Sequence, residues 1–223
     1  APALTDYDGD HSYTYGQVAE QMARLELLFD HLGVGAGDKV SICGRNCSNW
    51  GLAFLATLAH RSVVVSILPD FTTESIHELV RHSDSKLLFV SPTIMRRLDP
   101  AQMPQLVSII SLDDFSSIAG QAVSSDFIDK IFQEHYPKGY SIRNVNLPTD
   151  NHDELALINY TSGSTGSPKG VMLNGRSLSN NVEVGLSLLP VESGQRLVSM
   201  LPLAHMFGQI CEFLYPMCAG THI

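Results

Sequence analysis

The residues best suited to chemistry in this chain lie in one short segment rich in glycine and hydroxyl side chains. It follows an apolar stretch, 155–160, and reads Tyr160-Thr161-Ser162-Gly163-Ser164-Thr165-Gly166-Ser167-Pro168-Lys169-Gly170. Glycines let the backbone turn sharply and approach an anion, because they carry no side chain. Successive backbone N–H groups in such a turn form a concave anion site, hydroxyl groups donate to phosphate oxygens, and a lysine adds a compact positive charge. The segment is therefore predicted to bind phosphate groups.

The order of residues in this segment excludes three other kinds of site. A Walker A loop ends in Gly-Lys followed by Ser or Thr, whereas Lys169 follows Pro168 and precedes Gly170. A nucleophile elbow needs glycine two residues before its serine, and Ser164 has Ser162 there. The Gly-x-Gly-x-x-Gly fingerprint of dinucleotide-binding proteins is absent. On composition alone, a surface loop of glycine and serine remains an alternative.

Taken in order, residues 160–170 resemble the phosphate-binding signature of the adenylate-forming superfamily, which comprises acyl-CoA synthetases, peptide-synthetase adenylation domains and luciferases. Further along, Leu201-Pro202-Leu203-Ala204-His205-Met206-Phe207-Gly208 resembles the second core motif of the acyl-CoA ligases. Residues 13–40 look like the family's opening helix and strand, and residues 46–59 look like its next strand-to-helix passage. The resemblance thus covers most of the chain, and it is greatest to the long-chain fatty acid ligases.

This resemblance implies a two-step reaction. A carboxylate attacks the α-phosphate of ATP to give an acyl-adenylate and pyrophosphate, and the thiol of CoA then displaces AMP to form a thioester. The implied ligands are ATP, Mg²⁺, CoA and a long-chain fatty acid. Another carboxylic acid, or a carrier-protein thiol in place of CoA, is the alternative within the superfamily. The alternative from another class is a non-catalytic module that, taken by itself, binds nucleotide weakly or not at all.

The resemblance also implies a set of site residues. Those expected to bind the ATP phosphates are Thr161, Ser162, Gly163, Ser164, Thr165, Gly166 and Lys169, with the Thr161 hydroxyl as a ligand of Mg²⁺. Those expected to line the acyl pocket are His205, Phe207 and Gly208. A histidine in an apolar segment is more often a core residue, and Phe207 and Gly208 also fit a core helix, so a structural role is the alternative. The catalytic lysine, the magnesium-binding glutamate motif and the ribose-binding aspartate of the family are expected beyond Ile223, so the chain is expected to be truncated.

The elements that must position these residues alternate between helix and strand. A capping-box pattern, Thr14 with Gln17, opens an amphipathic helix that glycines end at 33–37. Helices are further expected over 48–59, 73–81, 126–136, 174–188 and 205–217, and strands over 39–43, 63–68, 86–90, 106–111, 155–160 and 196–201. Nearly continuous apolar strands between helices predict an α/β fold of mainly parallel strands flanked by helices. A polar stretch at 137–153 predicts a first α/β subdomain, 1–150, and the start of a second, 151–223, that carries the phosphate-binding loop.

Composition limits the partners of the chain. Its 223 residues carry a net charge of −9 with a pI near 5.3, which disfavours nucleic acids, so any phosphate site has to be local. No apolar run approaches the ~18 residues of a membrane helix, and no signal peptide is visible, so the cytoplasm is the expected location. Peripheral membrane contact and the oligomeric state stay open. The cysteines, expected to be reduced and mostly buried, are Cys43, Cys47, Cys211 and Cys218.

Overall fold

The computed structural model of the chain describes residues 1–9, 11–161 and 169–223. Its centre is a seven-stranded sheet in the order β7-β6-β5-β3-β4-β8-β9. The strands of this sheet are β3 (Lys39–Cys43), β4 (Val63–Ile67), β5 (Ser85–Val90), β6 (Ser108–Ser111), β7 (Ser117–Gly120), β8 (Leu155–Thr161) and β9 (Lys169–Asn174). Two further strands, β1 (Pro2–Thr5) and β2 (Ser12–Thr14), form a separate antiparallel pair.

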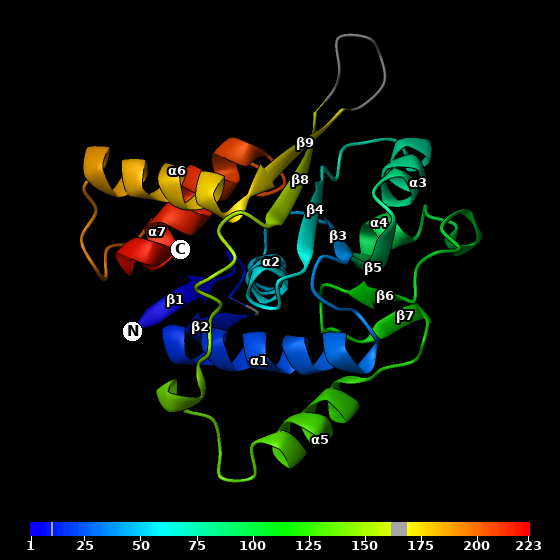
Figure 1. Ribbon diagram of the computed structural model, residues 1–223, viewed down its shortest axis with the longest axis horizontal. Coiled ribbons are helices and arrows are strands. Elements are labelled where there is room, and N and C mark those ends of the chain that lie inside the picture. The colour runs from blue at the N-terminus through cyan, green and yellow to red at the C-terminus, as the bar shows by residue number, and fades with distance from the viewer. Residues whose placement is uncertain (10, 162–168) are drawn as a thin grey trace.

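Helices connect the strands and lie around the sheet (Figure 1). They are α1 (Tyr15–His31), α2 (Ser48–Ala59), α3 (Thr73–His82), α4 (Pro92–Met95), α5 (Ser125–His135), α6 (Gly175–Leu188) and α7 (Tyr215–Ala219). Short 3₁₀ turns occupy Pro100–Gln102 and Ile142–Asn144, and a π-helix, Gly208–Leu214, runs directly into α7.

The inner strands of the sheet are parallel. β3 pairs with β4 and β5, β4 pairs with β8, and β5 pairs with β6, all in parallel register. The outer strands, β7 and β9, pair antiparallel with their neighbours. Parallel strands connected by helices need apolar residues on both faces, which explains the nearly continuous apolar runs of the sequence. The predicted α/β fold class is confirmed.

Alternate side chains of the strands enter two apolar clusters on opposite faces of the sheet. Along β4, Val64 packs in the cluster that includes buried residues of α1 and α2. Its neighbours Val63 and Val65 pack in the cluster that includes buried residues of α3 and α4. Because successive side chains of a strand point to opposite faces, one five-residue strand contributes to both cores.

The capping box predicted at the start of the first helix is confirmed. The Gln17 backbone N–H donates to Thr14 Oγ1 at 3.3 Å, and the Thr14 backbone N–H donates to Gln17 Oε1 at 2.8 Å, which completes the capping box. The helix ends at His31, and Gly33 follows with φ of 69°, a left-handed conformation that glycine adopts without strain.

The segment 196–201 is not the strand that its composition predicts. Its one ladder contact is an isolated parallel bridge between Arg196 and His222. The backbone beyond it is bonded by side chains instead: Glu212 Oε2 accepts from the N–H groups of Met200 and Leu201, each at 2.8 Å. These side-chain bonds take the place of a strand partner.

Two other elements differ from their predictions. Residues 205–217 are helical only in part, as the π-helix Gly208–Leu214 followed by α7. Residues 169–174 lie between the glycine-rich segment and the helix expected at 174, where no strand is predicted. They form β9, which pairs along its length with β8. Pairing with a neighbouring strand, rather than local composition, makes it a strand.

The predicted division near residue 150 falls between strands of a single sheet. β8, which follows the division, pairs with β4, which precedes it, as Val65 opposite Ile158. An ion-pair group also joins the two sides, because Arg61 pairs with both Asp150 and Glu154. The assignment of 1–150 and 151–223 to two subdomains stays a prediction.

All four cysteines are free thiols in the described chain. Cys43 is buried, Cys47 and Cys211 are half-buried, and Cys218 is exposed, so the expectation of mostly buried thiols is confirmed only at Cys43. Burial raises the pKa of Cys43 to about 12 and that of Cys47 to about 11, which keeps both thiols protonated near neutral pH. Among the residues described, no helix has the length and apolar character needed to cross a membrane.

Candidate functional site

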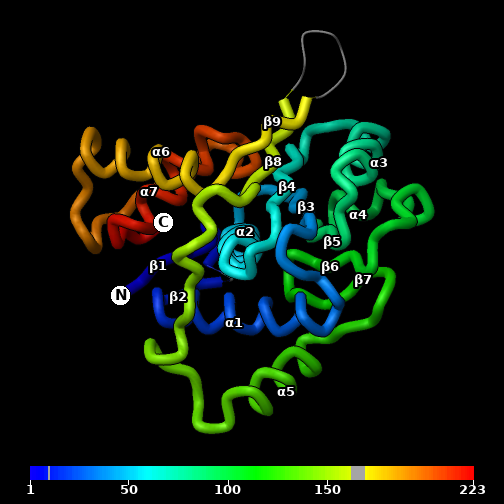
Figure 2. Tube along the Cα trace, in the orientation of Figure 1, coloured from blue at the N-terminus to red at the C-terminus, as the bar shows by residue number. Residues whose placement is uncertain are grey.

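The predicted phosphate-binding loop joins β8 to β9. Thr161 and Lys169 are paired across the hairpin at the ends of the two strands, and both side chains are exposed. The ends of the hairpin point away from the bulk of the chain (Figures 1 and 2). The predicted phosphate-binding residues between them lie outside the described residues; these are Ser162, Gly163, Ser164, Thr165 and Gly166.

The second motif, residues 201–208, lies against the carboxyl ends of three adjacent parallel strands. Asn46 follows β3, Ser66 is near the end of β4, and Asn159 is near the end of β8. Open α/β sheets bind their ligands at this edge. A polar side chain from each of these three places holds the segment that carries the motif.

Asn159 links β8, the strand before the predicted phosphate-binding loop, with the second motif. Its side-chain amide donates to the Ala204 carbonyl at 3.1 Å, and it is 4% exposed. A buried carbonyl that lost this donor would be left without its partner, at a cost of about 1–3 kcal/mol. The hydrogen bond therefore fixes His205, the next residue, relative to β8.

Asn46 holds the start of the motif from the β3 side. Its Nδ2 donates to the Leu201 carbonyl at 2.7 Å and to Ser199 Oγ at 3.2 Å, and its Oδ1 accepts from the Leu203 N–H at 2.8 Å. Glu212 Oε2 also accepts from the backbone N–H groups of Met200 and Leu201. Together these two side chains replace the strand pairing that the segment lacks.

Gly208 and Gln209 fit the end of the motif against the sheet. A Cβ on Gly208 would lie 2.5 Å from the Pro202 carbonyl oxygen, so only glycine allows this close approach. Gln209 is fully buried, and its Nε2 donates to Ser66 Oγ at 2.6 Å. Its Oε1 accepts no hydrogen bond from the described residues. Both positions begin the π-helix, a rare geometry that occurs often at functional sites.

His205 and Phe207 point outward from this support. Both are exposed, Phe207 by 58%. His205 Nδ1 accepts from the Phe207 N–H at 3.2 Å. When the imidazole is neutral, an accepting Nδ1 places the proton on Nε2, so the outer edge of the ring presents an N–H donor.

Tyr160 anchors the same strand on the other face of the sheet. Its hydroxyl lies 2.7 Å from Nδ1 of His82, the last residue of α3. Burial raises the pKa of Tyr160, so its hydroxyl stays protonated and can donate to that nitrogen. Asn159 and Tyr160 thus fix β8 on both faces directly before the loop.

Thr161 is the described residue predicted to bind Mg²⁺. Its side chain is exposed at the end of β8. Among the described residues, no group of three or more His, Cys, Asp or Glu side chains is placed to hold a metal ion. Mg²⁺ commonly keeps several waters and is held by substrate phosphates with few protein ligands, and a single exposed hydroxyl at the end of β8 fits that pattern.

Sequence reasoning did not identify the supporting side chains. Asn159 and Ser66 are polar residues within otherwise apolar strands, and Gln209 and Glu212 interrupt an apolar helix. A polar residue at a position that periodicity assigns to the core is the signal that could have identified them. However, the partner of Asn159 lies 45 positions away in the sequence, and the partner of Gln209 lies 143 positions away.

Comparisons with known proteins identify related sequences and folds. Long chain acyl-CoA synthetase 2 of Arabidopsis thaliana is 25% identical over 94% of this chain and 33% of its own length. 4-Coumarate–CoA ligase 1 of the same organism is 27% identical over 93% of this chain and 37% of its own length. The crystal structure of the anthranilate CoA ligase AuaEII in complex with anthranoyl-AMP superposes with a TM-score of 0.82 at 19% identity, over 99% of this chain and 40% of that one.

The chain therefore spans about a third of the length of these curated relatives. The family model of AMP-binding enzymes matches residues 1–223, which is the whole sequence. Because this model matches the whole sequence, the chain belongs to the AMP-binding enzyme family.

Proposed function

We propose that the protein containing this chain is an ATP-dependent ligase that activates a long-chain fatty acid as an acyl-adenylate and transfers it to CoA, with release of AMP and pyrophosphate. The observation that carries the proposal is the hydrogen bond from Asn159 to Ala204. It joins the strand before the phosphate-type loop to the motif that resembles an acyl-pocket segment. We propose that this junction brings ATP and the carboxylate together.

The phosphate loop supplies the charge neutralisation that the first step needs. Two anions, the carboxylate and the triphosphate, must meet in line, so catalysis consists mostly of positioning and electrostatic stabilisation. The residues assigned to this role are Thr161, Ser162, Gly163, Ser164, Thr165, Gly166 and Lys169. Lys169 attracts the triphosphate from the rim of the loop, where its side chain is exposed, and is not assigned as the catalytic lysine.

Mg²⁺ would be held by the ATP phosphates with the Thr161 hydroxyl as a protein ligand. Bound there, the ion would neutralise charge on the phosphate oxygens. The chain's own contribution is to fix the position of Thr161, because β8 is bonded on one face through Asn159 and on the other through Tyr160.

The acyl pocket is assigned to His205, Phe207 and Gly208. The outward Nε2–H of His205 is a donor suited to a carboxylate oxygen, and the exposed ring of Phe207 offers an apolar wall. Gly208 contributes by its lack of a side chain, which lets the motif close on the Pro202 carbonyl.

Alternatives exist for two parts of the proposal: the carboxylic acid that is activated and the thiol that accepts the acyl group. A long-chain acid is supported by similarity to long chain acyl-CoA synthetases 2 and 3 of Arabidopsis thaliana. An aromatic acid is the alternative favoured by the similarity to 4-coumarate–CoA ligase 1. A carrier-protein thiol in place of CoA is the second alternative.

The deciding experiment is acid-dependent exchange of pyrophosphate into ATP by the protein that contains this chain. The panel comprises fatty acids of increasing length, 4-coumarate, and an amino acid as control. We expect exchange with long acyl chains. Exchange only with 4-coumarate or an amino acid would overturn the fatty acid assignment, and no exchange with any acid would overturn adenylation. Supplying CoA after adenylate formation, and looking for the thioester, tests the acceptor.

The chain by itself is proposed to be inactive. The chain spans about a third of the length of its curated relatives, so it is proposed to hold only part of the nucleotide site. Calorimetric titration of residues 1–223 with ATP and Mg²⁺ should therefore give weak or undetectable binding, and tight binding would contradict this proposal.

A further inference from the structure

The first and the last residue of the motif 160–170, Tyr160 and Gly170, are not assigned to ATP or to the acid. They are paired with each other across the hairpin of β8 and β9. The next pair of this hairpin joins Thr161 and Lys169, the two described residues proposed to bind the ATP phosphates. The positions of Thr161 and Lys169 therefore depend on what fixes Tyr160 and Gly170.

The Tyr160 ring lies close against Gly170. An added Cβ at Gly170 would lie 3.2 Å from Tyr160 Cε1 and 3.0 Å from Ile158 Cγ2, so a side chain there has to displace its neighbours by a few tenths of an ångström. Gly170 is not among the glycines with positive φ, so space and not backbone conformation favours glycine here. An aromatic ring that covers a glycine of a neighbouring strand helps to fix the register of the pair.

His82, the last residue of α3, fixes the Tyr160 ring at its hydroxyl end. Its Nδ1 lies 2.7 Å from the Tyr160 hydroxyl, and the two rings meet edge to face with their centroids 5.9 Å apart. A neutral imidazole with its proton on Nε2 accepts the hydroxyl proton at Nδ1. Tyr160 is 3% exposed and packs in the apolar cluster that includes buried residues of α3, so the ring is constrained along its whole length.

The end of α3 that carries His82 is itself fixed to the centre of the sheet. The hydroxyl of Ser83, the next residue, donates to the Val80 carbonyl at 3.1 Å and lies 2.8 Å from Ser85 Oγ in β5. Ser85 Oγ in turn lies 2.7 Å from Ser41 Oγ in β3. The three hydroxyl groups are buried. The contact from His82 to Tyr160 therefore connects two inner strands, through α3, with the hairpin of β8 and β9.

We infer that His82 and Tyr160 act together as positioning residues for the phosphate site, by fixing where Thr161 and Lys169 lie at the ends of β8 and β9. The hydrogen bond fixes the ring, and the ring fixes β9 through Gly170. A site that is ordered before its ligand arrives loses less conformational freedom on binding. The effect on ATP rests on the proposed function, whereas the contact between α3 and the hairpin does not.

The test compares two substitutions of His82 in pyrophosphate exchange by the protein that contains this chain. His82→Phe keeps a ring and removes the acceptor, whereas His82→Asn places an amide oxygen near the position of Nδ1. We expect His82→Phe to raise the KM for ATP and the KM for pyrophosphate equally, by about fivefold, the usual effect of one lost hydrogen bond. The KM for the acid should not change, and His82→Asn should keep all three constants near those of the unaltered protein.

This pattern separates positioning from a general loss of stability. A variant that is merely less stable contains less active enzyme, which lowers kcat and leaves every KM unchanged. Tyr160→Phe should reproduce the effect of His82→Phe, and the double variant should add little to either, because both changes remove the same hydrogen bond. Gly170→Ala should raise the same two KM values, since its Cβ displaces the ring.

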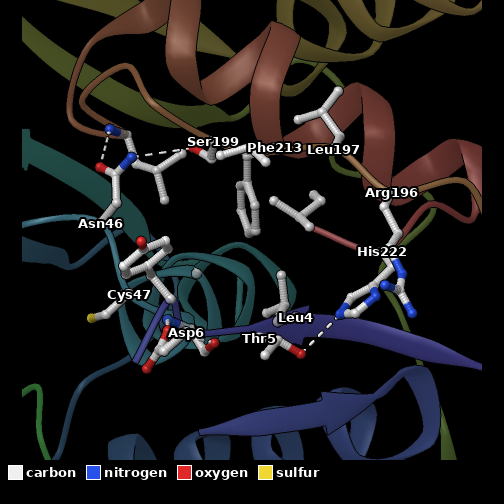
Figure 3. Close-up of a pocket in the computed structure, with 16 residues that line it drawn as sticks. Leu4, Thr5, Asp6, Asn46, Cys47, Arg196, Leu197, Ser199, Phe213 and His222 are labelled. Carbon is white, nitrogen blue, oxygen red and sulfur yellow. Dashed lines mark hydrogen bonds between the residues drawn. The ribbon is translucent and has the colours of Figure 1, made fainter. Parts of the chain in front are cut away.

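Two matched variants control for the chemistry of these changes. Thr5→Val removes another hydroxyl–imidazole hydrogen bond, between Thr5 Oγ1 and His222 Nε2 at 2.8 Å, in the separate β1–β2 pair (Figure 3). Gly16→Ala adds a Cβ in α1 that meets nothing within 4 Å. Both controls should leave the three KM values unchanged.

Hydrogen–deuterium exchange tests the positioning without any activity. The paired amides of β8 and β9 should exchange faster in His82→Phe and in Tyr160→Phe than in the unaltered protein, and at the unaltered rate in His82→Asn. Unchanged deuterium exchange in the first two variants, or a KM for the acid that rises as much as the KM for ATP, would overturn the inference. If the unaltered protein exchanges pyrophosphate with no acid, the proposed function fails, and deuterium exchange still decides whether His82 fixes the hairpin.

Discussion

At the scale of single residues, Lys169 is proposed to attract ATP without taking part in the chemical step. Its side chain is exposed at the rim of the loop. We expect Lys169→Ala to raise the KM for ATP roughly tenfold, about the effect of one lost charge-assisted hydrogen bond, while kcat changes little. Steady-state pyrophosphate exchange at varied ATP measures both constants.

Lys138→Ala is the matched control for this prediction, since Lys138 is also exposed and lies far along the chain from the loop. A complete loss of adenylation in Lys169→Ala would contradict the assignment of Lys169 to attraction and would make it essential to the chemical step.

Gly208 is a second residue whose role is geometric. Because an added Cβ would lie 2.5 Å from the Pro202 carbonyl oxygen, Gly208→Ala has to displace the turn that presents His205. We expect a loss of about 1–3 kcal/mol in the free energy of unfolding. Exchange activity should fall more than stability at the assay temperature explains. Gly194→Ala, where a Cβ meets nothing but φ is 84°, controls for backbone strain alone.

At the scale of elements, local patterns account for most helices and inner strands. The predicted helix 48–59 coincides with α2, because its apolar residues are buried and flanked by clear breaks. β9 and the segment 196–201 could not be predicted in this way. β9 is a strand because β8 lies beside it, and 196–201 is not one because Asn46 and Glu212 bond its backbone.

The same distinction applies to the site. The loop at 161–169 and the motif at 201–208 follow from the order of residues, and their roles stay predictions. The contacts between β8 and the motif depend on the pairing of β4 with β8, and this pairing cannot be predicted from the local sequence pattern. Asn159 and Gln209 therefore appear in the sequence only as polar residues in apolar surroundings.

α1 contains a carboxyl group whose titration affects stability. Glu26 is half-buried, and desolvation, with a smaller contribution from Asp30, raises its pKa from 4.5 to about 7. Burial raises the pKa values of Tyr136 and Tyr140, beyond α5, and the charge of Glu26 raises them further. No ion pair to Glu26 is present among the described residues.

The sign of the effect follows from proton binding. The folded state holds the proton of the Glu26 carboxyl more tightly than the unfolded state does. The stabilisation that protonated Glu26 gives the folded state is therefore fully present below about pH 4.5 and is lost as the pH rises through about 7. We expect Glu26→Gln to raise the free energy of unfolding by about 1–2 kcal/mol near pH 8, a value reduced for the partial exposure of the group. The gain should shrink on lowering the pH towards about 5.

Urea unfolding at both pH values measures this change. Glu78→Gln, at an exposed position of α3, is the control and should leave stability unchanged at either pH. A gain for Glu26→Gln that is the same at both pH values would show that the side chain acts through packing instead of its charge.

At the scale of the whole molecule, the question is whether the parts before and after residue 150 unfold together. Trp50 is the single tryptophan, is fully buried in α2, and reports on the first part. Leu157 lies in β8, in the second part, and packs in the same apolar cluster as Trp50. Because β8 also pairs with β4, we expect one cooperative transition.

Leu157→Ala tests this expectation. Removing a fully buried leucine should lower the free energy of unfolding by about 2–5 kcal/mol. The Trp50 fluorescence transition should then shift to lower urea together with the circular dichroism transition, while Leu188→Ala, which truncates a leucine 72% exposed on α6, should move neither. If Trp50 unfolds at its original midpoint while the circular dichroism signal splits into two steps, residues 1–150 are a separate unit and the shared sheet does not couple them. A common shift would instead mean that residues 1–150 and the strand β8 unfold in one cooperative step, as their pairing in one sheet predicts.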